Sequence, residues 1–276
     1  MNKQTERLID KIYNSIFKKI FTKNRIKDLT KGNLANVNLA AVQLQNSKKF
    51  NDFAKKFSKQ LSAKSLNKQK GLWKKYYQAA KSKHIGVLAD TYSEFEKQMF
   101  EKVVKENFKM ISSIPTKVMN VFEQKGVQTL LQQTVAGKIG RKSFETELKK
   151  HGSKNAKLIA RTESAKLQTA IDEYRATSLG SVCYEWLSSK DKRTRKSHQD
   201  MNGVIVFWRN DTNEKPLLDN MRGNAGEFPN CRCTTLPILD ENDLTKSQYK
   251  LYNYKTNKVV TVSKKTLLDF IKLGHL

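Results

Sequence analysis

Apolar residues recur every three or four positions over roughly the first 180 residues, which is the spacing that places them on one face of an α-helix. The first such stripe comprises Leu8, Ile9, Ile12, Tyr13, Ile16, Phe17, Ile20 and Phe21. No proline precedes Pro115, so the commonest helix breaker is missing from this part of the chain. The pattern predicts a largely helical N-terminal region, in which Gly152-Ser153 separates a short helix from a long one that ends near Ser178.

The first predicted helix is both amphipathic and basic, because lysines flank its apolar stripe. Such a helix can lie on an anionic membrane surface, or it can pack its apolar face into the core of its own chain. We favour the core. No apolar run approaches the roughly 20 residues that cross a bilayer, so we expect no stable membrane insertion.

After Gly180 the pattern changes to the alternation that is typical of strands. Predicted strands lie around Trp186, at 204–207 after the turn signal Asn202-Gly203, and at 231–236. A hairpin at 251–262 and a short helix at 264–273 follow. The fold class is therefore α+β: a basic helical region at 1–130, a small α+β module at 131–240, and a C-terminal hairpin and helix at 241–276.

The charge of the chain indicates which kind of partner it binds. The chain carries 53 Lys and Arg against 26 Asp and Glu, a formal net charge of +27. That field favours a polyanion, with DNA or RNA as the first candidate and an anionic membrane or an acidic protein as the others. Paired lysines interleaved with aromatic residues are the candidate nucleic-acid contacts: Lys48, Lys49, Lys55, Lys56, Lys74 and Lys75.

The rare residues gather between Trp186 and Cys233. His198, Cys231 and Cys233 are candidate ligands for a structural zinc ion, with Asp191 or Asp200 as an oxygen donor. If the cysteines lie in a strand, both sulfurs share one face. The alternative is that they are small buried hydrophobic residues, since an odd count of three cysteines is typical of a protein made in a reducing cytosol.

A second interpretation makes this region a nuclease or toxin-like enzyme, with His198 as general acid or base and Arg193 and Arg195 on phosphate. The sequence places no second histidine or glutamate to complete that pair. It also contains no phosphate-binding loop, nucleophile elbow or zinc-protease motif. The sequence therefore favours a protein that is not an enzyme.

Arg161 and Glu163 lie on the long predicted helix but two positions apart, so they do not face each other. Each needs a partner elsewhere, and we expect them to clamp the helix to the module that follows. An ion pair from Arg193 to Asp191 or to Glu163 is the candidate.

These residues together resemble a known family. The ordered series Ala160-Arg161-Thr162-Glu163, Trp186, Asp191 to Arg195, His198, Asn202-Gly203, Phe207 and Pro229 to Cys233 is similar to the phage Mu F-like head-morphogenesis domain over about residues 130–240. Arg161, Glu163, Trp186, Asp191, Arg193, His198, Gly203, Cys231 and Cys233 are the structural motif residues.

The resemblance implies a minor head protein of a tailed double-stranded DNA phage, made in the host cytoplasm. It further implies a place inside the head near the portal, a role in virion assembly, and contacts with portal, capsid or scaffold proteins and with packaged DNA. The family has no established catalytic residues, so the resemblance adds nothing to the nuclease interpretation.

Overall fold

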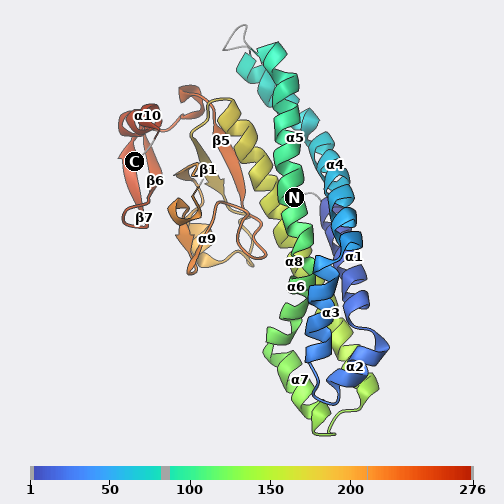
Figure 1. Cartoon of the computed structure of the whole chain (residues 1–276). Helices are drawn as coiled ribbons and strands as arrows, with labels where there is room; N and C mark the ends of the chain where they lie inside the picture. The colour runs from blue at the N-terminus through green and yellow to red at the C-terminus, as the bar shows by residue number, and fades with distance from the viewer. Residues whose placement is uncertain (1–2, 82–87, 210, 275–276) are drawn as a thin grey trace. The chain divides into compact units, whose positions relative to one another are not determined.

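The computed structural model describes residues 3–81, 88–209 and 211–274, with side chains described except at 68–81, 88–96 and 212. Its helices, in chain order, are α1 Lys3–Ile20, α2 Lys23–Leu29, α3 Ala35–Asn46, α4 Lys48–Lys81, α5 Leu88–Ser112, α6 Ile114–Met119, α7 Lys125–Val135, α8 Arg141–Ser178, α9 Lys196–Asp200 and α10 Lys264–Leu273. The strands are β1 Cys183–Leu187, β2 Val204–Phe207, β3 Leu217–Leu218, β4 Met221–Arg222, β5 Thr234–Ile238, β6 Gln248–Asn253 and β7 Lys258–Ser263. This is the α+β order that the sequence predicts (Figure 1).

The chain divides into two compact units. The helical unit comprises residues 2–71 and 100–161, and the sheet unit comprises Met1, 72–99 and 162–276. These boundaries differ from the predicted divisions after residues 130 and 240. They differ because α8 is one continuous helix with residues in both units, and because β6 pairs with β2 inside the same sheet.

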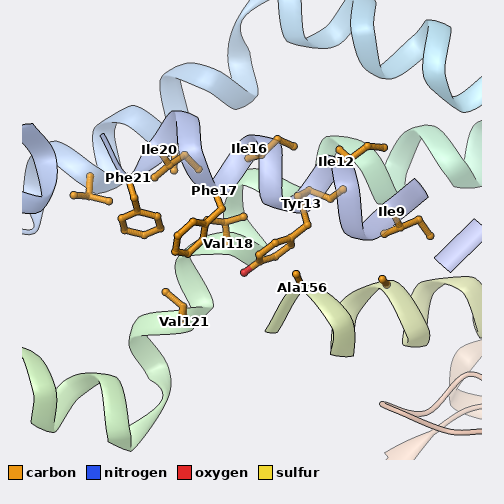
Figure 2. Packing of buried hydrophobic residues seen from close by; sticks show 14 of the residues in the cluster. Ile9, Ile12, Tyr13, Ile16, Phe17, Ile20, Phe21, Val118, Val121 and Ala156 are labelled. Atoms are coloured by element: carbon orange, nitrogen blue, oxygen red, sulfur yellow. The ribbon is translucent and has the colours of Figure 1, made fainter. Parts of the chain in front are cut away.

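The helical unit is built around the apolar face of α1. Ile9, Tyr13 and Ile20 are fully buried, and they share a core with residues of α6 and α8 such as Val118 and Ala156 (Figure 2). Asn155 donates a hydrogen bond of 2.8 Å to the hydroxyl of Tyr13, whose pKa is raised by burial. The preference for core packing over a membrane surface is confirmed, since the apolar face of α1 is already covered.

The sheet unit contains a five-stranded sheet in the order β5-β1-β2-β6-β7. All neighbouring strands are antiparallel except β2 and β6, which run parallel. Strands β1 and β2 and the β6–β7 hairpin lie at the predicted positions, and α10 packs on β6 and β7. The hairpin turns at Asn257, which has a left-handed backbone with φ of 53°.

The two faces of this sheet bury two different sets of side chains. Tyr184, Trp186, Val204 and Val206 point to a core shared with α8 and the two cysteines, Cys231 and Cys233. Cys183, Ile205 and Phe207 point to a core shared with Leu267 of α10. Side chains alternate between the two faces of a strand, and the central strands are buried on both faces of the sheet. One of these two faces packs against the candidate site.

The predicted helix break at Gly152-Ser153 is wrong, since α8 continues through both residues. The reason lies in packing. A Cβ at Gly152 would lie against the ring of Phe17, 2.6 Å from its Cζ. The glycine therefore lets the aromatic ring of α1 reach the backbone of α8, and it does not end a helix.

None of the helices in the described ranges combines the length and the apolar character needed to cross a membrane.

Gly152→Ala should destabilise the helical unit by about 1–3 kcal/mol through overpacking, although alanine favours a helix by about 1 kcal/mol over glycine. Urea denaturation monitored by circular dichroism measures the free energy of unfolding. The matched control is Phe17→Leu, alone and combined with Gly152→Ala, because a smaller side chain relieves the contact. An equal penalty for Gly152→Ala in both backgrounds would contradict this explanation.

Candidate functional site

Three buried side chains from distant parts of the sequence meet on the α8 side of the sheet. His198 Nδ1 lies 3.4 Å from Cys231 Sγ and 3.5 Å from Cys233 Sγ. The exposed fractions are 2%, 4% and 5%, so solvent scarcely reaches the three side chains. Among the described residues they form the only group of three histidine, cysteine or carboxylate side chains placed to share a metal ion, with all ligand atoms within 4.8 Å of one another.

The imidazole of His198 is held in one orientation by aromatic neighbours. The rings of Trp186 and Phe228 stand edge-on to it, with centroid distances of 5.8 and 4.9 Å. One ring nitrogen, Nδ1, therefore faces the two sulfurs. The other, Nε2, is buried without a direct hydrogen bond and lies 3.5 Å from the Asp219 Oδ2 atom.

Asp219 is fixed in turn by a tight hairpin and two polar contacts. It forms the β3–β4 turn with Asn220, and both have positive φ values, 52° and 61°, as a two-residue turn of this kind requires. Ser197 Oγ donates to its Oδ1 at 2.7 Å, and Arg195 Nε lies 3.2 Å from its Oδ2. Its carboxylate is consequently directed at His198.

The two cysteines precede strand β5, which begins at Thr234, and so the prediction that they lie in a strand is wrong. The loop turns at Asn230, where φ is 56°, a value that asparagine tolerates well. This turn, and not strand alternation, lets both sulfurs face one imidazole. A backbone hydrogen bond from Asn230 N to Thr162 Oγ1 at 2.9 Å ties the loop to α8.

Arg232, between the two cysteines, anchors the loop from its outer side. Its guanidinium makes two contacts with the Asp191 carboxylate, of which Nη2 to Oδ1 measures 2.6 Å. These hydrogen bonds, helped by the backbone N–H of Arg193, lower the pKa of Asp191 to about 2. The expected ion pair from Arg193 to Asp191 is therefore replaced by one from Arg232, while Arg193 contributes its backbone.

The backbone at Gly226 also approaches helix α8 closely. Gly226 has φ of 91°, and a Cβ there would lie 2.6 Å from Thr169 Oγ1 and 3.3 Å from the Cys233 carbonyl oxygen. Thr169 donates a 2.6 Å hydrogen bond to the Ala225 carbonyl oxygen. Only glycine fits between the helix and the cysteine loop.

The two thiols influence each other's ionisation. A hydrogen bond from Cys233 and contact with His198 lower the pKa of Cys231, against the opposing effect of burial. The pKa of Cys233 is raised, because its thiol proton is held in the hydrogen bond to Cys231 and because burial and a negative charge at Cys231 disfavour a second thiolate. A pair of sulfurs that readily holds one negative charge is suited to a cation.

The other predicted residues lie outside the histidine and cysteine cluster. Gly203 has φ of 79° and donates its N–H to the Trp186 carbonyl oxygen at 2.8 Å, which closes the turn into β2. Arg161 lies 3.7 Å from Glu6 within the helical unit, and Glu163 lies 3.8 Å from Lys166 within the sheet unit. Asp200 pairs with Lys196 at 2.7 Å and is not part of the histidine and cysteine cluster.

The nuclease interpretation gains no support from this geometry. A general base must come within hydrogen-bond reach of its substrate, and His198 is 2% exposed among aromatic rings and thiols. Arg195 is engaged with Asp219, and Arg193 lies beside an occupied ion pair.

The candidate DNA contacts form a separate surface on the solvent face of α4. Lys48, Lys49, Lys55 and Lys56 are exposed, as are Lys59 and Lys64 of the same helix. In the described part of the chain none of these six lysines is paired with a carboxylate. The side chains of Lys74 and Lys75 lie outside the described residues.

Sequence reasoning missed Asp219, Arg232 and Thr162. Asp219-Asn220 carries a turn signal, and Thr162 lies inside the recognised helical motif, but their contacts span 21 and 68 positions. No local pattern reveals such partners. Arg232 lies between the two cysteines, but nothing in the sequence indicates that it pairs with Asp191, 41 positions away.

Comparison with known proteins finds similarity over the region that contains this site. Residues 125–236 match the model of the family described as Phage Mu protein F like protein. An uncharacterized protein of Haemophilus influenzae is 33% identical over 141 residues, which is 50% of this chain and 29% of that protein. The NAD(+)--arginine ADP-ribosyltransferase EFV of Enterococcus faecalis is 35% identical over 98 residues, 32% of this chain and 19% of that enzyme.

The chain thus spans less than a third of the length of either relative, and the activity in the second name is stated for that enzyme alone. No solved structure matches the chain.

Gly226→Ala should destabilise the sheet unit by about 1–3 kcal/mol more than Gly180→Ala. Both positions have positive φ, near 90°, so an alanine costs about 1–2 kcal/mol in backbone strain at each. Only Gly226 has atoms within 4 Å of the added methyl group. Differential scanning calorimetry of the two variants measures the difference, and equal penalties would show that the close approach to α8 contributes nothing.

Proposed function

Because residues 125–236 of this chain form a Phage Mu protein F like domain, we propose that the protein is a minor head protein that acts in the assembly of a phage head. The observation that carries the proposal is the match itself, together with the built frame around His198, Cys231 and Cys233 inside the matched range. Every contact of that frame serves to hold segments together. The proposed role is therefore structural, not enzymatic.

We further propose that the protein contacts packaged double-stranded DNA without sequence preference. The net charge of +27 supports this, since basic side chains that neutralise phosphates release counterions. The exposed lysines of α4 are the best candidates. From Lys48 to Lys64 they cover 17 residues, or about 24 Å of helix, and Asp52 is the only acidic residue among them.

We also propose a place inside the head near the portal, which the same family match supports. Portal and capsid or scaffold proteins are the proposed protein partners. The helical unit offers exposed apolar side chains at Leu39, Val42 and Phe53, which are suited to a protein contact. Synthesis in the host cytoplasm agrees with three free cysteines.

Replacing Lys48, Lys49, Lys55 and Lys56 by Gln should weaken binding to a short DNA duplex and flatten its salt dependence. Each lost phosphate contact reduces the slope of log K against log salt concentration by about 0.9, so four contacts reduce it by as much as about 3.6. Fluorescence anisotropy across a salt series measures both quantities.

The matched control replaces four lysines that already pair with carboxylates: Lys109, Lys149, Lys150 and Lys196. Both variants lose the same formal charge, so the control separates a local DNA-binding face from the overall field. Equal losses in both would contradict a role for α4. Duplex that is cut during the assay would contradict the structural role and support a nuclease.

For the head-assembly role, co-expression with the portal, scaffold and major capsid proteins of the same phage should incorporate the chain into procapsids at a few copies per particle. Quantitative mass spectrometry of purified procapsids measures the copy number. Particles assembled without the portal protein are the control, and they should lack the chain. Incorporation that does not depend on the portal would contradict portal association.

A further inference from the structure

We propose that His198 Nδ1, Cys231 Sγ and Cys233 Sγ bind a structural zinc ion, which ties helix α9 to the loop before β5. This goes beyond the proposed role in head assembly and does not depend on it. The inference starts from the ligand chemistry. Imidazole nitrogen and cysteine sulfur are the donors that zinc prefers in proteins, and the three side chains meet in a pocket that solvent scarcely reaches.

The separations of the donor atoms fit a tetrahedral ion. Zinc bonds of about 2.3 Å to sulfur and 2.0–2.1 Å to nitrogen place neighbouring sulfur and nitrogen atoms about 3.6 Å apart. The two observed separations are 3.4 and 3.5 Å. One nitrogen thus lies at the required distance from both sulfurs, a symmetry that a single thiol–imidazole hydrogen bond does not need.

The other side of the imidazole supplies an independent observation. A histidine that binds metal through one nitrogen usually donates its other N–H to a carboxylate. His198 Nε2 is buried, makes no direct hydrogen bond, and lies 3.5 Å from Asp219 Oδ2. A movement of about 0.5 Å would bring this pair to hydrogen-bond length. Asp219 is itself held by Ser197 and Arg195, so it is a positioning residue with its own support.

The same atoms also present a cysteine, a histidine and an aspartate in series, as in a nucleophilic triad. Burial argues against that use, because a nucleophile must meet its substrate and Cys231 is 4% exposed. The second thiol, at an equal distance from Nδ1, has no role in a triad.

The decisive measurement is the metal content of the full-length wild-type protein after incubation with zinc and desalting, by inductively coupled plasma mass spectrometry. We expect about one zinc per chain, and cobalt(II) substitution should give the visible absorption of a tetrahedral site with sulfur ligands. Wild-type protein that retains less than about a tenth of an equivalent would overturn the proposal, and so would an intact mass two hydrogens short, which indicates a Cys231–Cys233 disulfide.

Variants assign the site. Cys231→Ser and Cys233→Ser should each abolish stoichiometric binding, whereas Cys183→Ala should retain it, because Cys183 lies in the core on the other face of the sheet. Retained binding in both serine variants, or loss in Cys183→Ala with its fold intact by circular dichroism, would place the metal elsewhere.

A milder variant keeps the test independent of folding. Asp219→Asn should lower zinc affinity about 10- to 100-fold, measured by competition with a chromophoric chelator, while still reaching one zinc per chain at saturation. Asp269→Asn, an exposed position on α10, is the matched control and should leave the affinity unchanged. Equal affinities in the two variants would remove Asp219 from the site.

Alkylation separates the zinc site from a nucleophilic triad. In the zinc-loaded protein Cys231 and Cys233 should resist iodoacetamide, and a chelator should expose both at the same rate at which metal is lost. Rapid alkylation of Cys231 alone in the zinc-loaded protein would overturn the proposal and favour the triad.

Discussion

The sheet unit depends on one close approach, between the C-terminal half of α8 and the loop of residues 224–233. Gly226 leaves no room for a side chain between Thr169 and the carbonyl oxygen of Cys233. The hydrogen bonds Thr169 to Ala225 and Asn230 to Thr162 lie on either side of that contact. Because the loop is fixed to a helix at these points, the two cysteines that end it have little freedom, and the position of their sulfurs is set by backbone packing.

Each polar group around the cysteines is held in place by a further group. His198 is oriented by aromatic rings and by Asp219, Asp219 by Ser197 and Arg195, and the Cys-Arg-Cys loop by Asp191 through Arg232. Partly buried polar groups are costly unless they are paired, so an array with this many matched partners indicates a site whose geometry matters. Within the array, His198 Nε2 lacks a direct hydrogen bond.

The sequence predicts most of the secondary structure, because helix and strand periods are local signals. The apolar stripe of α1, the alternation in β1 and β2, and the β6–β7 hairpin are all where their patterns indicate. Gly152 was misleading, since a glycine can mark either a helix end or a close contact, and the contact with Phe17 is 135 positions away in sequence. The boundary between the two compact units could not be predicted either, because no local sequence signal marks residue 161 inside the continuous helix α8.

For the site, the sequence indicates the ligand types but not how they come together. Cys231, Cys233 and His198 stand out by rarity, yet the reason their donor atoms converge is a left-handed Asn230 and a hairpin that presents Asp219. Both depend on the pairing of β3 with β4 and on the contact between the loop and helix α8. A single sequence does not reveal such contacts. The wrong strand assignment for the cysteines illustrates this. Alternation along a strand predicts that both sulfurs share one face, but in the structure both cysteines precede the strand.

Charge and site chemistry occupy different parts of the molecule, and this separation bears on function. Six exposed lysines that pair with no carboxylate among the described residues lie on α4 in the helical unit, whereas the histidine and cysteine frame lies in the sheet unit. Within the sheet unit the arginines near the frame, Arg195 and Arg232, are bound to carboxylates. A basic protein that used the frame on a polyanion would keep those guanidinium groups available. Their internal pairing instead favours a matched domain stabilised from within, joined to helices whose surface charge is left for an anionic partner.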